Sequence, residues 1–287
     1  MDLVSETVWE AALILCTVMS RKIRSIDCVN ILELGCGVGL SGFFVSKLAL
    51  TLRSTLVITL SDFDSSALKN LGITIDQNFE YFPVRKNDFH NFDAESLSSP
   101  PAVDICLESI DWLNFSFPPG DHQDDEDNVI RKHRKWIMGS ALCYLPQHEA
   151  LADVVHHYIS RMGVDEAIIV QIRDRDGLQE CLSRLTLLGM KVAVTDVSSE
   201  IFDATNAAVY CRTVEHRDDG GSDEQVRIRM RKRYLFHLPS LWGDVTPSSP
   251  LQLPESPDTG SPWSTSYRNH LLTSDRAAFV IVTVTAP

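Results

Sequence analysis

Three glycines at alternating positions, Gly35, Gly37 and Gly39, are the feature best suited to chemistry in this chain of 287 residues. They follow a short apolar run, Val29–Leu34, and precede an apolar segment at helical spacing. Glycine permits a sharp turn and a close backbone approach to a ligand, and the helix that follows offers free N–H groups. A dinucleotide site favours Gly-x-Gly-x-x-Gly, with a pyrophosphate at that helix end. Here the spacing is shorter, and Glu33 would repel a pyrophosphate.

Glu33 and Asp62 are two acids that suit a nucleoside ligand carrying an ammonium group. Asp62 follows the next apolar run, Leu56–Leu60, and a carboxylate there can accept hydrogen bonds from a ribose diol. S-adenosyl-L-methionine has an ammonium group and a ribose but no phosphate, so we predict it as the cofactor. Each feature also has a plainer explanation, because glycine turns are common and Asp62 could cap a helix. Asp64 is a rival for the ribose, or could cap the same helix itself.

The elements that must position these residues alternate between strand and helix. The patterns predict strands at 29–34, 56–60, 102–107, 136–142, 166–172, 190–195 and 277–285, and helices at 8–19, 40–50, 65–78, 148–162 and 177–188. A strand, a glycine turn, a helix and a second strand begin a right-handed βαβ unit with a parallel sheet. The fold class predicted from these patterns is α/β.

The composition excludes several classes of protein. Lys and Arg number 26 and Asp and Glu number 39, so the net charge is −13, which disfavours a broad nucleic-acid surface. The sequence has neither a secretory signal pattern nor an apolar run long enough for a membrane span. The seven cysteines form no Cys-x-x-Cys pair, so we expect no metal and a cytoplasmic protein with reduced thiols. We further expect a monomer without membrane association.

Two stretches interrupt the alternation of strands and helices. Residues 116–135 are Pro- and Asp-rich and end in a basic run, and residues 212–270 include the Ser/Pro-rich segment 246–266. We interpret both as insertions in a single domain that spans 1–287. A second basic run, Arg227–Arg233, could contact RNA, but such a run is more often a solvated face.

Several motifs resemble those of the seven-β-strand S-adenosylmethionine-dependent methyltransferases. ILELGCGVGLSG and VITLSDFD are similar to motifs of that superfamily, whereas WEAALIL from Trp9, SIDW at 109–112 and SALCYLPQHEAL resemble methyltransferase family 16, a group of protein-lysine methyltransferases. Residues 167–192 are similar to a strand and helix of the family members that methylate elongation factor 2. The resemblance implies a Rossmann-like, mostly parallel seven-stranded sheet, with helices on both faces and an antiparallel C-terminal strand.

The resemblance also implies roles for single residues. The methionine end of the cofactor would be held by Glu33, Gly35, Gly37 and Gly39. Its ribose would be held by Asp62, and its adenine would contact Asp111 and Trp112. Trp9 would lie against the cofactor, and Tyr144 would line the methyl-transfer site. Both tryptophans could instead be core residues. Ala141 stands at the cofactor site in place of the aspartate of the family's Asp-x-x-Tyr motif.

The function implied is lysine N-methylation of a protein, with elongation factor 2 or another translation protein as the substrate. Because Ala141 replaces an acid, a catalytically impaired, methyltransferase-like binding protein is an alternative. A small-molecule methyltransferase is a second alternative. A nicotinamide-dependent dehydrogenase is disfavoured by the glycine spacing and by Glu33.

Overall fold

The computed structural model describes residues 10–24, 28–77, 103–115, 134–143, 147–217, 228–236, 265–269 and 276–287. Their contacts divide the chain into two compact units, one of residues 1–201 with 274–287 and one of residues 202–273. The predicted site residues that the structure describes all lie in the first unit. The second unit overlaps the predicted insertion at 212–270.

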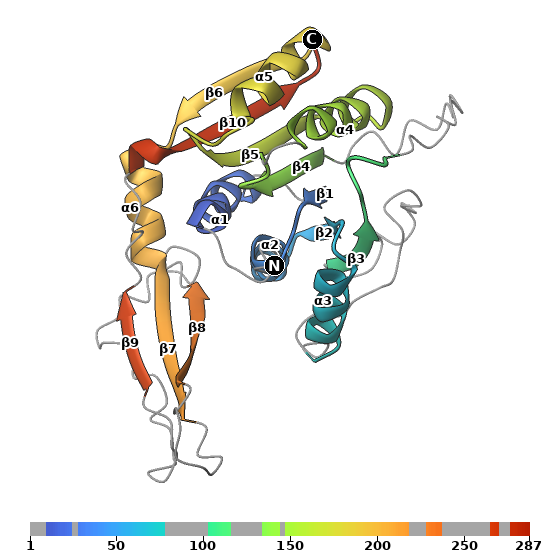
Figure 1. Cartoon of the computed structure of the whole chain (residues 1–287). Coiled ribbons are helices and arrows are strands. Elements are labelled where there is room, and N and C mark those ends of the chain that lie inside the picture. The colour runs from blue at the N-terminus through green and yellow to red at the C-terminus, as the bar shows by residue number, and fades with distance from the viewer. Residues whose placement is uncertain are drawn as a thin grey trace. The chain divides into compact units, whose positions relative to one another are not determined.

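A seven-stranded sheet forms the centre of the first unit, in the order β3-β2-β1-β4-β5-β10-β6 (Figure 1). The pairs β1–β2, β2–β3, β1–β4 and β4–β5 are parallel, and β10 is antiparallel to both β5 and β6. This is the Rossmann-like fold of the seven-β-strand methyltransferases, as the sequence predicted. The strands are β1 (Cys28–Leu34), β2 (Thr55–Asp62), β3 (Val103–Ser109), β4 (Arg134–Ser140), β5 (Glu166–Ile172), β6 (Lys191–Asp196) and β10 (Phe279–Thr285).

The central strands are buried on both faces, which explains their continuous apolar runs. In β2 every residue from Leu56 to Asp62 is buried, and in β5 the same holds from Ala167 to Gln171. Outer strand β6 has largely exposed side chains and contributes little to the core.

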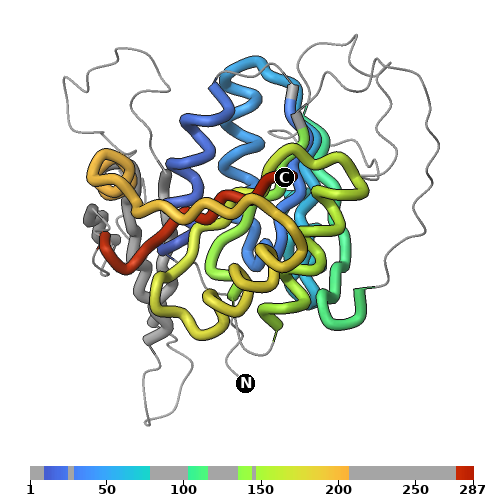
Figure 2. Tube along the Cα trace, turned by 90° about the horizontal axis from the view of Figure 1, so that it is seen from above, coloured from blue at the N-terminus to red at the C-terminus, as the bar shows by residue number. Residues whose placement is uncertain are grey.

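Helices cover both faces of the sheet (Figure 2). On one face, α1 contacts β4, β5 and α2, and α2 also contacts β2. On the other face, α4 and α5 share a core cluster with Leu32, Leu34, Ile137 and Ile169. The helices are α1 (Glu10–Ile23), α2 (Leu40–Leu52), α3 (Ser65–Gln77), α4 (His148–Arg161), α5 (Leu178–Leu187) and α6 (Ser199–Ala208), and a short 3-10 helix, η5 (Arg276–Ala278), precedes β10.

Two local predictions need correction. The strand predicted at 136–142 ends at Ser140, because the next residue, Ala141, has a φ of 53° that no strand accommodates. Helix α6 was not predicted from the sequence.

The second unit contains a three-stranded antiparallel sheet in the order β8-β7-β9. Its strands are β7 (Val209–Arg217), β8 (Ile228–Phe236) and β9 (Thr265–Asn269). The basic run therefore falls largely on β8. Most of insertion 116–135 and most of the Ser/Pro-rich segment lie outside the described residues.

Among the described residues, no helix is long and apolar enough to cross a membrane. The same residues contain no group of His, Cys, Asp and Glu side chains that could hold a metal ion.

Candidate cofactor-binding site

Four neighbouring strands end at the same edge of the sheet, and the predicted site residues other than Trp9 stand in the sequence at or just after the ends of these strands. Strands β3, β2, β1 and β4 are adjacent and parallel. The chain order along the sheet reverses between β1 and β4, and such a reversal opens a crevice outside the carboxyl ends of the strands. Residues that follow these four ends, far apart in the sequence, are therefore neighbours in space.

The glycine turn connects β1 to α2, and its glycines are required by both backbone conformation and close packing. Gly35 and Gly39 have φ angles of 59° and 71°, in the left-handed region that favours glycine. A Cβ atom on residue 35 would lie 2.8 Å from Cδ2 of Leu142 and 3.6 Å from the indole of Trp112. A Cβ on residue 39 would lie 2.5 Å from Leu71 of α3. The turn is thus packed between the ends of the neighbouring elements.

Asp62, the last residue of β2, holds the glycine turn. Its Oδ2 accepts a hydrogen bond from the backbone N–H of Gly37 at 2.9 Å, and its Oδ1 accepts one from the N–H of Asp64 at 3.0 Å. The side chain is 6% exposed. A carboxylate has about four acceptor positions, so two remain for a ligand. Asp62 and the glycine turn therefore form one structural unit.

Asp64, the rival for the ribose role, has a different task. Its Oδ1 accepts hydrogen bonds from the backbone N–H of Ser66 at 2.9 Å and from the Ser66 hydroxyl at 2.6 Å. This is the bonding pattern of a helix N-cap, and α3 begins at Ser65. The residue that caps α3 is therefore Asp64 and not Asp62.

Glu33 is buried beneath the first turn of α2, with an exposed fraction of 3%. The Ser41 hydroxyl and the Gly42 backbone hydrogen-bond to its carboxyl group, whereas one oxygen, Oε2, has no hydrogen-bond partner. Burial, and to a lesser extent the negative charge of Asp62, raises the pKa of Glu33 to about 8. The carboxyl group therefore holds a proton near neutral pH.

Asp111 and Trp112 follow β3, but only the indole reaches the glycine turn. Trp112 is half-buried and packs toward Gly35. Asp111 is exposed, and its carboxylate accepts hydrogen bonds from the Leu113 N–H at 3.0 Å and the Asn114 side-chain amide at 2.7 Å. These bonds, chiefly that from Asn114, lower the pKa of Asp111. The Asp111 carboxylate therefore bonds within the turn that follows β3.

A tight turn with Ala141 follows β4. The left-handed Ala141 is 2% exposed, and its N–H donates to the carbonyl of Val170 at 2.9 Å. The side chain of Gln171 is 0% exposed, and with its amide turned so that the oxygen faces the turn, it accepts hydrogen bonds from the N–H groups of Leu142 at 2.7 Å and Cys143 at 3.1 Å. Gln171 thereby fixes the turn that carries Leu142 to Gly35.

Two of the predicted site residues, Trp9 and Tyr144, lie outside the described residues. Sequence reasoning in turn missed two features of the site. Gln171 gives no local signal, because its partners lie on another strand's turn. Phe63, which is 63% exposed in the structure, does give a signal in the sequence. It is a large apolar residue that stands directly after Asp62, at the end of a predicted strand.

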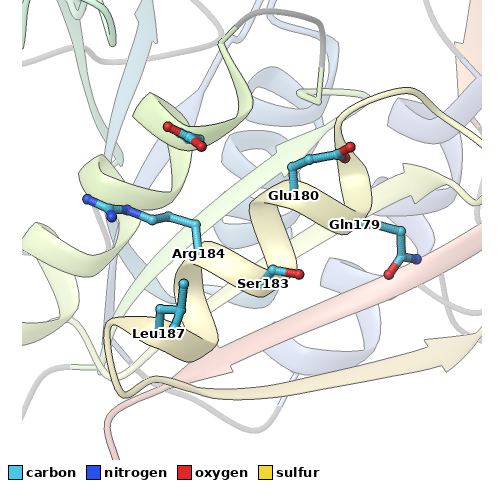
Figure 3. A pocket seen from close by; sticks show the side chains of 6 residues that line it. Gln179, Glu180, Ser183, Arg184 and Leu187 are labelled. Atoms are coloured by element: carbon cyan, nitrogen blue, oxygen red, sulfur yellow. The ribbon is translucent and has the colours of Figure 1, made fainter.

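A shallow groove on the same unit is separate from these residues. It lies along α4 and α5 and is lined by Glu149, Gln179, Glu180, Ser183, Arg184 and Leu187 (Figure 3). Arg184 pairs with Asp153 of α4 at 2.9 Å. No predicted site residue lines this groove.

One family model matches the N-terminal part of the chain. Residues 2–87 match the model of a family described as lysine methyltransferase. The matched segment includes the glycine turn, Glu33 and Asp62, and ends before β3. A search of curated protein sequences found no match.

Solved structures similar to the chain are methyltransferases of low sequence identity. A precorrin-6y C5,15-methyltransferase from Geobacter metallireducens GS-15 is 11% identical, with a TM-score of 0.38, over 95% of this chain and 87% of that one. A SAM-dependent methyltransferase from Aquifex aeolicus is 12% identical, with a TM-score of 0.40, over 66% of this chain and 88% of that one. Coclaurine N-methyltransferase bound to N-methylheliamine and SAH is 15% identical, with a TM-score of 0.38, over 70% of this chain and 54% of that one.

Proposed function

We propose that the chain is an S-adenosylmethionine-dependent protein-lysine N-methyltransferase. The observation that carries the proposal is the arrangement of Glu33, the glycine turn and Asp62 at neighbouring strand ends, within the segment that matches the lysine methyltransferase family. The sheet of alternating strands and helices supports methyl transfer as the reaction. The buried carboxyl group of Glu33 supports S-adenosylmethionine as the ligand.

The residues present fit this cofactor. Glu33 has a buried oxygen without a partner, which suits an ammonium donor, and Asp62 retains acceptor positions for ribose hydroxyls. Exposed Phe63 and half-buried Trp112 offer apolar surface for an adenine ring. The glycine turn, with Gly35 and its neighbours, permits a close backbone approach.

When bound, this cofactor supplies an electrophilic methyl group for direct transfer to an amine. The protein must therefore hold donor and acceptor in line and exclude water, and positioning of this kind accounts for much of the rate in comparable reactions. A lysine must lose its proton first, and a desolvating pocket lowers the pKa of an amine. We propose Tyr144 as the residue that orients this amine.

We propose a basic protein as the substrate, because the chain has a net charge of −13 and opposite charge favours encounter. Elongation factor 2 is the first candidate to test. A small-molecule amine remains the alternative substrate class. Neither the groove on α4 and α5 nor the second unit is needed for this proposal.

Ala141 favours a second candidate function, an impaired methyltransferase that binds the cofactor without transferring its methyl group. The methyl side chain of Ala141 supplies no charge at the end of β4, next to the turn held by Gln171. Reintroducing an acid with Ala141→Asp should raise methyl transfer if the site has decayed. It should leave transfer unchanged or reduced if the wild-type site is active.

The experiment that tests the proposal has two parts. Calorimetry with S-adenosylmethionine should show saturable binding to the full chain. Incubation with labelled methyl donor and purified elongation factor 2, or a mixture of basic proteins, should then label a lysine. Failure of the cofactor to bind would overturn the proposal, whereas binding without labelling would support the impaired protein.

A further inference from the structure

The environment of Glu33 differs from that expected of a residue that simply attracts a cation. Its carboxyl group is 3% exposed and faces the interior between β1 and α2. A Cβ atom on Gly42 would lie 2.6 Å from Oε2, so this unpartnered oxygen lies directly under the first turn of α2.

The titratable groups that face Glu33 in the described part of the chain carry no positive charge. They are the Cys16 thiol from α1, the Cys36 thiol from the glycine turn and the carboxylate of Asp62 from β2. Helix α2 contributes only the Ser41 hydroxyl and the Gly42 backbone. An ionised Glu33 would therefore be a buried charge beside a second carboxylate, which is costly. The ligand-free protein avoids this cost by holding a proton, in line with the raised pKa of about 8.

We propose that Glu33 releases this proton when an ammonium-bearing ligand binds, so that cofactor binding is coupled to proton release. The inference rests on the proposed function, since it takes S-adenosylmethionine as the ligand. The balance is simple: the O–H bond of Glu33 breaks, the proton passes to the buffer, and the ligand's ammonium group neutralises the carboxylate. A ligand without that group cannot compensate the buried charge. Glu33 thus selects for the amino-acid end of the cofactor.

The coupling predicts a specific pH dependence of affinity. Between pH 6 and 7, where ligand-free Glu33 is protonated, the affinity should rise about tenfold per pH unit, because one proton must leave for each ligand bound. Above about pH 8 the rise should end, since an α-amino group of ordinary pKa also loses its charge there.

Calorimetry measures this proton directly. The full chain is titrated with S-adenosylmethionine at pH 6.5 in phosphate and in imidazole, two buffers that differ in their heat of protonation. The difference in heat should correspond to release of nearly one proton per site, because a Glu33 with a pKa of about 8 is almost fully protonated at pH 6.5. The same titration with 5′-methylthioadenosine, which has the nucleoside but lacks the amino-acid end, should release none.

Glu33→Gln provides the second arm of the experiment. The amide has nearly the same shape and no proton to release, so any binding it retains should show the same heat in both buffers. Should this variant not fold, the comparison of the two ligands on the wild-type protein decides the question. Binding of S-adenosylmethionine without a buffer-dependent heat overturns the inference and leaves the proposed function intact, as does proton release that persists in Glu33→Gln. No binding at all overturns the proposed function.

Discussion

The carboxylate of Asp62 accepts a hydrogen bond from the backbone N–H of Gly37 at 2.9 Å, although 25 positions separate the two residues. The bond joins the end of β2 to the turn that follows β1. It holds the acid and the turn at a common edge of the sheet, the edge at which open α/β sheets generally bind their ligands. The acid and the glycine turn, the two strongest signals of the sequence, are therefore joined in one structural unit.

Asp62→Asn should weaken cofactor binding, because an amide oxygen accepts hydrogen bonds less strongly than a carboxylate. Hydrogen bonds to charged groups contribute about 1.5–3 kcal/mol, so the dissociation constant should rise roughly 10–100-fold. Calorimetric titration with S-adenosylmethionine measures the change. Asp64→Asn is the matched control, since Asp64 caps α3 and should change binding little. If both variants bind S-adenosylmethionine equally weakly, Asp62 has no specific role in binding the cofactor.

The stability of the protein should fall as the pH rises, because of Glu33. Its pKa lies at about 8 in the folded protein, above the value of 4.5 in the unfolded chain. Protonation therefore favours the folded state, and the free energy of unfolding should decrease between about pH 4.5 and pH 8, by up to about 1.4 kcal/mol per pH unit. Urea unfolding at several pH values checks this. Glu33→Gln should flatten that part of the profile, and an unchanged slope in the variant would contradict the assignment.

Gln171→Leu should destabilise the protein and loosen the turn after β4. The variant leaves the N–H groups of Leu142 and Cys143 without their acceptor, and each unsatisfied buried group costs about 1–3 kcal/mol. Thermal or urea unfolding should show a loss of about 2–6 kcal/mol. Gln179→Leu, at an exposed position of α5, should change stability by less than about 0.5 kcal/mol. Comparable losses in the two variants would argue against the role of Gln171.

Gly35→Ala separates backbone strain from steric crowding when it is compared with Gly163→Ala. The two glycines have similar φ angles of 59° and 65°, but only at Gly35 would a Cβ atom meet a neighbour, Leu142 at 2.8 Å. Gly163→Ala should cost about 1 kcal/mol of stability from strain alone. Gly35→Ala should cost about 1–3 kcal/mol more, from crowding. Urea unfolding measures both, and equal costs would mean that Leu142 yields freely.

The sequence by itself determined the features that depend on neighbouring residues. The glycine turn, the acid at the end of β2 and most boundaries of the strands and helices were predicted, because local backbone preferences and apolar periodicity are written in short segments. The prediction placed the end of β4 two residues late, since nothing in Ala141 announces a left-handed conformation.

The tertiary structure decided what depends on residues distant in the sequence. The strand order, which reverses between β1 and β4, brings Trp112 and Leu142 to Gly35. It also lets Gln171 hold the turn after β4. The protonation state of Glu33 belongs here too, because a carboxyl group keeps its proton only where packing removes water and supplies no cation. The sequence thus supplies Glu33, and its burial in the folded protein sets whether its carboxyl group carries a charge.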